Sequence, residues 1–437
     1  MHNCDILISA DVIITQNAGR DILTQSALAI KDGKISALGE CAALTELYQP
    51  GRTLKLGKAL LMPGLINAHT HMPMTMMRGK ADDLPLMDWL NRHIFPMERA
   101  LNAHILQVGT DLACAEMLRT GTTAFCDMYL SESNIYKATN KNGLKALVGE
   151  AIFSFPSLGY KNPADALKVA RAQANELSGN PRIRYSIAPH SVYTTTPELL
   201  VSCAELALEL ELPLQIHLAE SAGESSACVK LHGCRPVELV RRAGLLGPNT
   251  TIAHGVDLTE EEIKLLAQTE TVVAHNPRSN MKLASGTANL STMIEKGVLL
   301  GLGTDGAASN NSLNMFAEMS ACALLHKLST LDPTALPAQR VLDMATLGGA
   351  KALHWPELGT LSVGSPADLT ALDLTSPNLC PLYSPLSHLC YAATGHEVML
   401  TMIDGHILYE NGKFNSIDYP ALLQEVDAVS AFMQKQK

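Results

Sequence analysis

The sequence predicts an α/β fold, in which eight parallel strands and their covering helices form a (β/α)8 barrel beside a small β domain. The chain of 437 residues is too long for one ordinary domain of roughly 100–200 residues, and a barrel with a small companion fits this length. Strand-like and helix-like segments alternate through the middle of the chain, as a parallel sheet with helical crossovers requires. Both ends of the chain contain hairpin-like segments instead.

The small β domain is predicted from the two ends of the chain together. Near the N-terminus, apolar residues alternate around Asp32-Gly33, a dipeptide that accepts the positive φ angles of a tight hairpin. The last eighty residues look similar, with Asp404-Gly405 and Asn411-Gly412 between apolar runs. Because an isolated hairpin is barely stable in water, these pieces should pack together. We therefore assign residues 1–59 and 361–437 to one discontinuous β domain, and residues 60–360 to the barrel.

The predicted barrel has eight candidate strands separated by helix-like segments. The strands are expected at residues 61–67, 122–128, 145–153, 182–190, 212–220, 250–256, 271–277 and 297–305. The helix-like segments between them repeat apolar residues at steps of three and four. The clearest helices are Ala103–Arg119, Asp165–Leu177, Pro197–Leu210 and Thr259–Gln268.

Ionisable residues stand at the ends of these otherwise apolar strands. They are His69 and His71, Asp127, His190, His217 with Glu220, His254, His275 and Asp305. Buried parallel strands are normally apolar throughout, and an isolated buried charge is costly, so a whole set at one end needs partners. In a (β/α)8 barrel the carboxyl ends of the strands carry the catalytic groups. We interpret these residues as one functional rim.

A metal site is predicted from four of the strand-end residues. His69 and His71 are two positions apart, so both imidazoles lie on one face of a strand. Alone, this pair could equally well bond backbone carbonyl groups. Together with His217 and Asp305 it supplies three imidazoles and a carboxylate, a set that suits a divalent ion such as Zn²⁺.

Three further strand-end residues have less certain roles on sequence grounds. Glu220 lies three residues beyond His217, where a carboxylate is placed to transfer protons, although a simple ion pair on the rim is the alternative. His254 is a candidate hydrogen-bonding group beside the ion, or an ordinary core histidine. His275 stays unassigned, because it could support its loop rather than contact a substrate.

Composition excludes several classes of protein. The 33 basic and 43 acidic residues give a net charge of −10, which argues against binding to a nucleic acid polymer. No segment resembles a signal peptide or a spanning helix, and the ten cysteines show no CxxC pair. We expect a cytoplasmic protein with no membrane partner. Charged residues make up only 17%, which indicates a large core or a homo-oligomer interface.

Several blocks of the sequence resemble the amidohydrolase superfamily over essentially the whole chain. They include MPGLINAHTHMPM, LPLQIHLAES, TIAHGVDLT, VAHNPRSNMKLASG, GLGTDGAASNNSLNMFAEM and GTLSVGSPADLTALD. The blocks DWLNRHIFPMERAL and APHSVYTTTPELL are most similar to the 5-methylthioadenosine/S-adenosylhomocysteine deaminase family. The resemblance implies a TIM-like metal-dependent hydrolase barrel with a small β-sandwich domain that both chain termini form.

The resemblance also implies roles for individual residues. One Zn²⁺ per subunit would be bound by His69, His71, His217 and Asp305. Catalysis would depend on Glu220, His254 and Asp305. The substrate would contact Glu98 through its ribose hydroxyls and His190 through its purine, and would also contact Glu220 and Asp305. A carboxylate such as Glu98 suits a cis-diol because it accepts two hydrogen bonds and donates none.

The implied reaction is hydrolytic deamination at C6 of the adenine ring of 5′-methylthioadenosine, S-adenosylhomocysteine or related nucleosides, with release of ammonia and the inosine analogue. The alternative is a related hydrolase that acts on guanine, a pterin, a cytosine-like ring or a chlorinated triazine. Glu98 and His190 distinguish the two, because a free base has no ribose. A metal-free interaction protein is the other class considered, but this chain keeps all four predicted ligands. Some members of the family carry an arginine in the third-strand region that can contact the carboxylate of an amino-acid tail. Glu150 lies near that place here, which puts S-adenosylhomocysteine in doubt more than methylthioadenosine, whose tail is uncharged.

Overall fold

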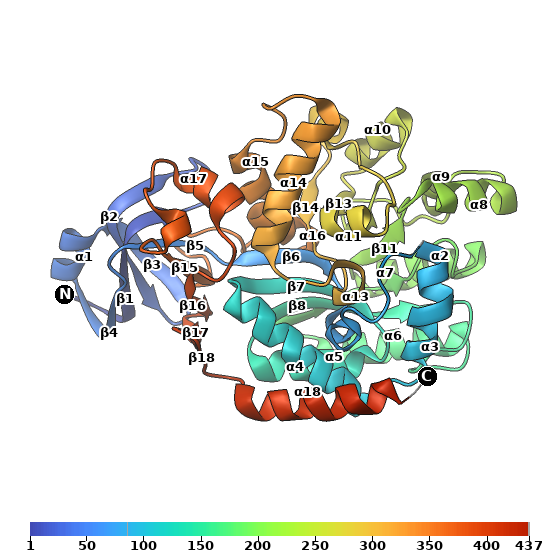
Figure 1. The fold of residues 1–437 in the computed structure, drawn as a ribbon, viewed down its shortest axis with the longest axis horizontal. Helices are drawn as coiled ribbons and strands as arrows, with labels where there is room; N and C mark the ends of the chain where they lie inside the picture. The colour runs from blue at the N-terminus through green and yellow to red at the C-terminus, as the bar shows by residue number, and fades with distance from the viewer. Residues whose placement is uncertain (85, 436–437) are drawn as a thin grey trace.

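The computed structural model describes residues 1–84 and 86–435, which form a large sheet beside a helix-covered set of parallel strands (Figure 1). The large sheet has nine strands in the order β18-β17-β16-β15-β5-β1-β2-β3, with β4 beside β1. Its strands are β1 (His2–Ile14), β2 (Ile22–Lys31), β3 (Lys34–Glu40), β4 (Tyr48–Lys55), β5 (Ala59–Pro63), β15 (Leu369–Asp373), β16 (Val398–Ile403), β17 (His406–Glu410) and β18 (Lys413–Phe414). Both ends of the chain therefore contribute to one sheet. The predicted division into residues 1–59 with 361–437 and residues 60–360 itself stays a prediction.

The three predicted hairpin turns are confirmed in this sheet. Asp32 and Gly33 connect β2 to β3 with φ angles of 51° and 75°. The dipeptides Asp404-Gly405 and Asn411-Gly412 connect β16 to β17 and β17 to β18, again with positive φ at both positions. Positive φ at both central residues gives the turn a twist that matches the twist of the flanking strands.

The remaining strands form two parallel sheets. The first contains β6 (Leu65–Thr70), β7 (Thr122–Tyr129), β8 (Lys145–Ile152), β9 (Ile183–Tyr185) and β10 (Ala188–Pro189). The second contains β11 (Leu214–Leu218), β12 (Thr250–His254), β13 (Val272–His275) and β14 (Leu300–Leu302). The sheets meet on one side through the bridges Ile187–Leu214 and Ser191–His217, and on the other the Asp305 N–H donates to the His69 carbonyl at 2.9 Å. A strand is present at each of the eight predicted positions.

The first predicted strand, 61–67, is wrong in one respect. It is two strands: β5 belongs to the nine-stranded sheet, and β6 begins the parallel strands. The chain changes sheet at Gly64, where a Cβ atom would lie 2.2 Å from the Thr123 side chain. Glycine is therefore required at this crossing, and the predicted boundary after residue 59 falls inside β5.

The predicted helices are present between the parallel strands. α4 (Ala103–Arg119) and α7 (Pro197–Leu210) have the predicted limits, and α6 (Pro163–Leu177) and α10 (Glu260–Gln268) differ by one or two residues. Side chains of Asn102, Asn162, Thr196 and Thr259 cap their first turns.

The other helices are α1 (Cys41–Leu47), α2 (Leu86–Trp89), α3 (Phe95–Glu98), α5 (Glu132–Asn142), α8 (Ala222–His232), α9 (Pro236–Arg242), α11 (Pro277–Lys282), α12 (Leu290–Glu295), α13 (Ala307–Asn310), α14 (Met315–Thr330), α15 (Ala338–Asp343), α16 (Gly349–Ala352) and α17 (Pro385–Ser387). Short 3₁₀ or π turns occur at η1 (Met72–Met77), η2 (Leu90–Ile94), η3 (Met344–Gly348), η4 (Pro377–Leu379) and η5 (His388–Ala392). Within residues 1–84 and 86–435, no helix is long and apolar enough to cross a membrane.

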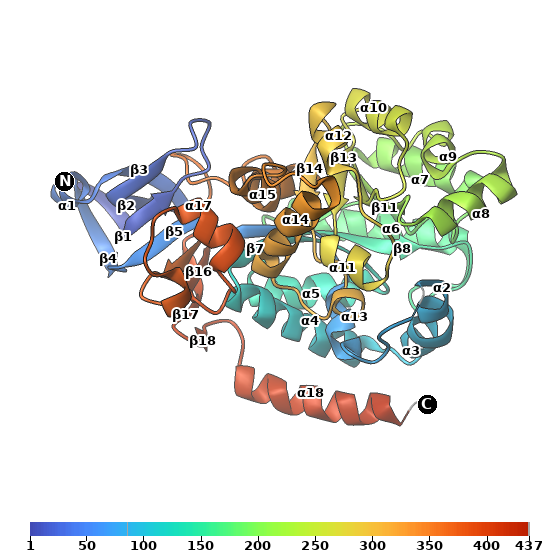
Figure 2. The same cartoon turned by 45° about the horizontal axis from the view of Figure 1, so that its top comes forward.

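The C-terminus was expected to be hairpin-rich, and it instead finishes in the helix α18 (Tyr419–Gln434). The Asp418 side chain accepts a hydrogen bond from the Ala421 N–H and caps the helix. Leu422, Val429 and Met433 are buried at helical spacing, and α18 packs along α4 rather than on the nine-stranded sheet (Figures 1 and 2). The prediction missed this helix because the hairpins before it dominate the pattern of this region.

A buried ion-pair group joins the parallel strands to the nine-stranded sheet. Lys145, the first residue of β8, lies with its Nζ 2.6 Å from Asp368 Oδ2 and 2.6 Å from Asp404 Oδ1. The Lys145 and Asp368 side chains are both almost fully buried. Asp368 precedes β15 and Asp404 is in the β16–β17 turn, so this group fixes the two parts of the fold against each other.

Removing one member of this group should destabilise the protein strongly. The substitution Lys145→Met leaves the Asp368 carboxylate buried without its partner, and we expect the free energy of unfolding to fall by roughly 3–5 kcal/mol. Urea denaturation measures this loss. The matched control is Arg52→Met, which breaks the exposed Arg52–Glu410 pair and should change the free energy by less than about 1 kcal/mol. Equal effects of the two substitutions would show that the buried group does not hold the fold together.

Candidate active site

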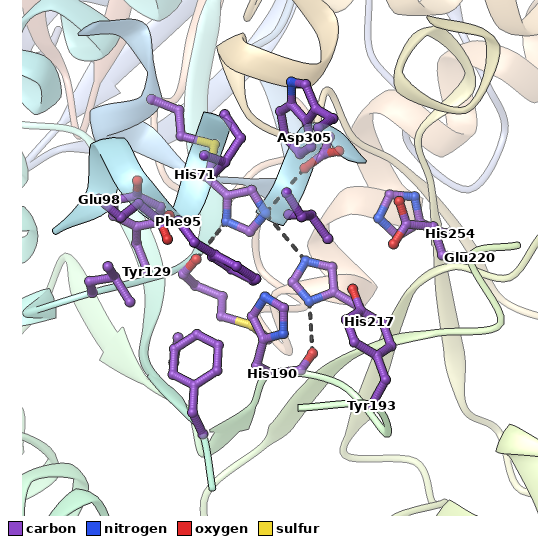
Figure 3. A pocket seen from close by; sticks show the side chains of 18 of the residues that line it. His71, Phe95, Glu98, Tyr129, His190, Tyr193, His217, Glu220, His254 and Asp305 are labelled. Carbon is purple, nitrogen blue, oxygen red and sulfur yellow. Dashed lines mark hydrogen bonds and ion pairs between the residues drawn. The ribbon is translucent and has the colours of Figure 1, made fainter. Parts of the chain in front are cut away.

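The predicted site residues converge on a single cavity at the carboxyl ends of the parallel strands (Figure 3). Seven of the eight line it: His71, Glu98, His190, His217, Glu220, His254 and Asp305. The eighth, His69, lies in β6 and is buried, with its ring centroid 4.9 Å from that of His71 and 4.8 Å from that of His217. Residues that lie in α3, or in or just after β6, β10, β11, β12 and β14, therefore meet at one place, as parallel strands with one common end allow.

Two of the three predicted histidine ligands, His71 and His217, are held with defined ring orientations. The Nδ1 atom of His71 is 2.6 Å from the Met128 carbonyl oxygen, and the Nδ1 of His217 is 2.7 Å from the His190 carbonyl oxygen. Because a carbonyl only accepts, both Nδ1 atoms carry protons, and both Nε2 atoms are directed into the cluster, 3.2 Å apart. The Nε2 of His69 is buried and has no hydrogen-bond partner within residues 1–84 and 86–435. This arrangement is typical of imidazoles that face a cation.

Asp305 completes the cluster with a carboxylate. Its Oδ1 lies 3.1 Å from His71 Nε2 and 3.7 Å from His69 Nε2. Burial opposes its ionisation, but the hydrogen bond and charge of His71 outweigh burial and hold the pKa of Asp305 well below its usual value. Burial also lowers the pKa of His71, yet Asp305 reverses this effect and raises that pKa to about 9. The cluster therefore favours a positive charge at its centre, from a proton or from a metal cation.

The donor set fits a divalent metal ion. Ligand atoms of His69, His71 and Asp305 lie within 4.8 Å of one another, as do those of His69, His217 and His254. Burial lowers the pKa of His69 and of His217 well below the usual value, so both imidazoles stay neutral and can donate lone pairs. Three imidazoles and a carboxylate are ligands that Zn²⁺ accepts readily. The assignment of these four residues as ligands stays a prediction.

Two further groups face the same end of the cavity. Glu220 follows β11 and is buried, and burial raises the pKa of its carboxyl group. A raised pKa means that the carboxylate binds a proton more readily than an exposed one does. This suits a group that must both accept and donate a proton during a reaction. His254, the last residue of β12, lies between the cluster and α11, with its Nδ1 2.9 Å from the Asn280 Oδ1.

The other end of the cavity is apolar, with two polar residues. Its walls are made by Trp89, Leu90, Ile94, Phe95, Met128, Tyr129 and Phe153. Burial raises the pKa of Glu98 to about 7, although Tyr129 and His71 act in the opposite direction. Burial and the charge of His71 lower the pKa of His190 to about 3, so its ring is neutral. The Nδ1 of His190 is 3.0 Å from Thr194 Oγ1, which orients the ring.

Three ionisable residues that the sequence placed near strand ends do not line the cavity. His275 is fully buried and contacts His326, with 3.1 Å between the two Nε2 atoms. Asp127 accepts hydrogen bonds from the Met72 N–H at 2.7 Å and from the Thr70 hydroxyl at 3.2 Å. Glu150 accepts from the N–H groups of Ser131 and Glu132, each at 2.8 Å. Asp127 therefore holds the end of β6 and the residues after it, Glu150 holds the start of α5, and His275 contacts α14.

Sequence reasoning missed most of the cavity wall. The aromatic residues Trp89, Phe95, Tyr129, Phe153 and Tyr193 line it, but nothing in their spacing distinguishes a cavity wall from a hydrophobic core. The structure adds one indication, because a π-helical turn, η2, separates α2 from α3 within residues 86–98. Such turns are frequent at functional sites, but the sequence does not show them.

The chain was compared with known proteins. Residues 60–408 match the model of the amidohydrolase family. A 5-methylthioadenosine/S-adenosylhomocysteine deaminase of Nitratidesulfovibrio vulgaris (strain Miyazaki F) is 57% identical over 423 residues, which cover 97% of this chain and 96% of the relative. A protein of the same name from Desulfovibrio desulfuricans is 51% identical and covers 100% of this chain and 99% of its own length.

Solved structures agree with this result. An adenosine deaminase from Xanthomonas campestris with bound zinc superposes with a TM-score of 0.97 at 37% identity, covering 99% of both chains. An atrazine chlorohydrolase from Arthrobacter aurescens, complexed with zinc, has a TM-score of 0.89 at 22% identity and covers 97% of this chain and 100% of its own, which shows a common fold. The chain therefore belongs to the amidohydrolase family, and within it to the 5-methylthioadenosine/S-adenosylhomocysteine deaminases.

Proposed function

We propose that this chain is a zinc-dependent hydrolase that deaminates the adenine ring of 5′-methylthioadenosine and related 5′-modified adenosines at C6. The products are ammonia and the inosine analogue. One observation carries the proposal: a single cavity joins the His and Asp cluster and Glu220 at one end to Glu98 and an apolar slot at the other. The names of the relatives and the zinc in the structural neighbours support it.

The proposed chemistry divides the cavity residues by their roles. When bound at the cluster, a divalent ion would lower the pKa of water towards about 7 and supply a hydroxide nucleophile. Glu220 accepts a proton from the attacking water and delivers it to the ring nitrogen next to C6. His254 forms a hydrogen bond at the attacking oxygen. Asp305 passes the second proton of the attacking water to the amino group, which then leaves as ammonia when the tetrahedral carbon at C6 collapses to a carbonyl.

We also propose that the two parallel sheets are halves of one closed (β/α)8 barrel, with a β-sandwich-like domain that both termini form. The bridges Ile187–Leu214 and Ser191–His217 support closure on one side, and the Asp305–His69 backbone hydrogen bond supports it on the other. The eight strand positions all deliver their carboxyl ends to the same side, where the cavity lies.

Further parts of the proposal concern the protein as a whole. We propose one Zn²⁺ per subunit, a cytoplasmic location and a homo-oligomer. All ten cysteines are free thiols, which supports a reducing compartment. Leu324, Leu328 and Leu331 on and after α14 are exposed at helical spacing, which supports an interface between copies.

The most informative experiment is a substrate panel. Ammonia release should be measured with adenosine, methylthioadenosine, S-adenosylhomocysteine, 5′-deoxyadenosine and guanine. We expect the highest kcat/KM with methylthioadenosine and very little turnover of guanine. Guanine turnover above that of methylthioadenosine would favour the alternative, a free-base deaminase.

Glu98 is predicted to recognise the ribose. In the Glu98→Gln variant the amide keeps only one acceptor oxygen, so we expect kcat/KM for methylthioadenosine to fall about 10- to 100-fold, the equivalent of one hydrogen bond to a charged group. A 2′,3′-dideoxy analogue is the control substrate, because it lacks the diol and should be turned over equally by both enzymes. An equal loss with both substrates would contradict diol recognition.

The same residue predicts a pH dependence. Only the ionised carboxylate accepts two hydrogen bonds, and the pKa of Glu98 is raised to about 7. For the wild-type enzyme, kcat/KM for methylthioadenosine should therefore rise from pH 6 to about pH 8, as Glu98 ionises. The Glu98→Gln variant should lose this part of the profile, and an identical profile in both enzymes would contradict the assignment.

The cavity also predicts selectivity for the 5′ substituent. Among the residues that the structure describes, none of those lining the cavity is Lys or Arg, and Glu150 is engaged with backbone N–H groups elsewhere. A charged amino-acid tail would lack a partner, so kcat/KM should be at least about tenfold higher for methylthioadenosine than for S-adenosylhomocysteine, a difference of about 1.4 kcal/mol. Competition between the two substrates in one reaction measures this ratio. A ratio near one would contradict it.

A further inference from the structure

The segment AHNPRSN, at residues 274–280, contains polar residues that the proposed chemistry does not use. Two of them, Ser279 and Asn280, are neighbours in the short helix α11 and are both buried. α11 begins just after the carboxyl end of β13. Ser279 contacts Asp305 and Asn280 contacts His254, and neither Ser279 nor Asn280 lines the cavity.

Ser279 holds one oxygen of Asp305. The Ser279 hydroxyl donates to Asp305 Oδ2 at 2.6 Å, and this is its single hydrogen bond among the residues that the structure describes. The Ser309 hydroxyl in α13 donates to the same oxygen at 2.7 Å. The other oxygen, Oδ1, remains directed at the Nε2 atoms of His71 and His69. The Gly306 N–H also donates to Oδ1, at 2.8 Å. The two hydroxyls on Oδ2 and this backbone N–H therefore fix the orientation of the carboxylate together.

Asn280 fixes the ring of His254. The His254 Nδ1 is 2.9 Å from Asn280 Oδ1, and because the amide oxygen only accepts, the proton is on Nδ1. The Asn276 amide nitrogen also lies near this atom, but at 3.5 Å. The shorter contact with Asn280 therefore orients the ring, with Nε2 on the side opposite Asn280.

Asp305 and His254 need such support because of their backbone conformations. Their φ angles are +62° and +77°, in the left-handed region that residues other than glycine rarely adopt. Strained conformations of this kind persist only when surrounding contacts hold them, and they are concentrated at functional sites. α11 supplies a contact to each of the two from adjacent positions.

We propose that Ser279 and Asn280 are positioning residues of the reaction: Ser279 orients Asp305 towards the ion, and Asn280 orients His254 towards the attacking oxygen. This inference rests on the proposed function, because it assigns to Asp305 and His254 the roles given there. It adds that one helix, α11, aligns two groups from different strands relative to each other.

The two contacts predict different signatures. For Ser279→Ala we expect kcat to fall about 10- to 100-fold with KM unchanged, and the affinity for zinc to fall by a similar factor. The visible spectrum of the cobalt-substituted protein should change as well, because Asp305 is a predicted ligand. For Asn280→Leu we expect a comparable loss in kcat, with metal affinity and cobalt spectrum unchanged, because His254 is not a predicted ligand. Asn280→Ala is the second variant if Asn280→Leu does not fold.

Matched variants separate positioning from general damage. Ser279→Thr keeps the hydroxyl and should restore most of the lost kcat. Ser225→Ala is the control, and its activity should equal that of the wild type. Ser225 is also a buried serine, but its hydroxyl has no hydrogen-bond partner among the described residues. The inference is overturned if Ser279→Ala behaves like Ser225→Ala, or if Ser279→Ala and Asn280→Leu alter the cobalt spectrum equally. Failure of the proposed function itself would be distinct, because the wild-type enzyme would then release no ammonia from methylthioadenosine.

Discussion

The Glu220→Gln variant should lose at least about 10³-fold in kcat for methylthioadenosine while it retains its zinc. The amide has the shape of the carboxylate but cannot accept the proton of the attacking water or deliver one to the ring. Glu220 lies on the cavity side of the turn after β11 and is not one of the four predicted ligands, so the ion should remain bound. Single-turnover kinetics and metal analysis of the same preparation measure the two quantities.

The control for this variant is Glu205→Gln, an exposed glutamate on α7 whose substitution should leave kcat unchanged. Near-normal turnover by Glu220→Gln would contradict its role in proton transfer. Loss of zinc together with activity would also contradict the account, because it would make Glu220 a ligand.

The His217→Ala variant should lose the metal and, with it, all measurable turnover. The Nε2 of His217 lies 3.2 Å from that of His71, and its Nδ1 is fixed by the His190 carbonyl group. Removing one of four predicted ligands should weaken zinc binding strongly. The loss should be far more than the roughly 10- to 100-fold that is typical when a residue that only hydrogen-bonds to a ligand is substituted. Dialysis against a chelator of known affinity, followed by metal analysis, measures the change.

His396→Ala is the matched control, because His396 is an exposed histidine far along the chain from the cluster. It should bind zinc as the wild type does. Addition of free imidazole should restore part of the metal binding of His217→Ala, since imidazole can occupy the space of the lost ring. Zinc binding of His217→Ala equal to that of His396→Ala would show that the ligand set is wrong.

The predicted site residues lie together because parallel strands end on a common side, and their individual roles stay predictions. His69, His71, His217, His254 and Asp305 are distant in the sequence, but each follows an apolar run of strand length. The period of two along a strand and the shared direction of all strands then bring them together without any knowledge of the turns between them. The three Gly-containing hairpins were predictable for a similar reason, since positive φ is a local property of those dipeptides.

The rest of the fold depended on long-range contacts that no local pattern shows. The break between β5 and β6 is set by the close approach of Gly64 to Thr123, about sixty residues away. The helix α18 has the apolar spacing of a helix, and it packs on α4, which lies about three hundred residues earlier in the chain. A local pattern could identify the helix, but it could not say where the helix would pack.

Ser279 and Asn280 could not be predicted from the sequence for a different reason. Their residue types and spacing are ordinary, and their proposed role follows only from the Asp305 carboxylate and the His254 imidazole that they contact. Glu150 shows the converse case. It lies near the place where some family members carry a substrate-binding arginine. Glu150 does not line the cavity, and its carboxylate accepts hydrogen bonds from the N–H groups at the start of α5.

The most direct test of the account is to follow the oxygen atom in the reaction. Zinc-loaded enzyme should be incubated with methylthioadenosine in heavy-oxygen water, and the nucleoside product analysed by mass spectrometry together with the ammonia released. We predict one ammonia per product molecule and one solvent oxygen at C6 of the purine, with neither product formed by the chelator-treated enzyme. Cleavage of the glycosidic bond, or an unlabelled purine, would contradict hydrolytic deamination as the function of this site.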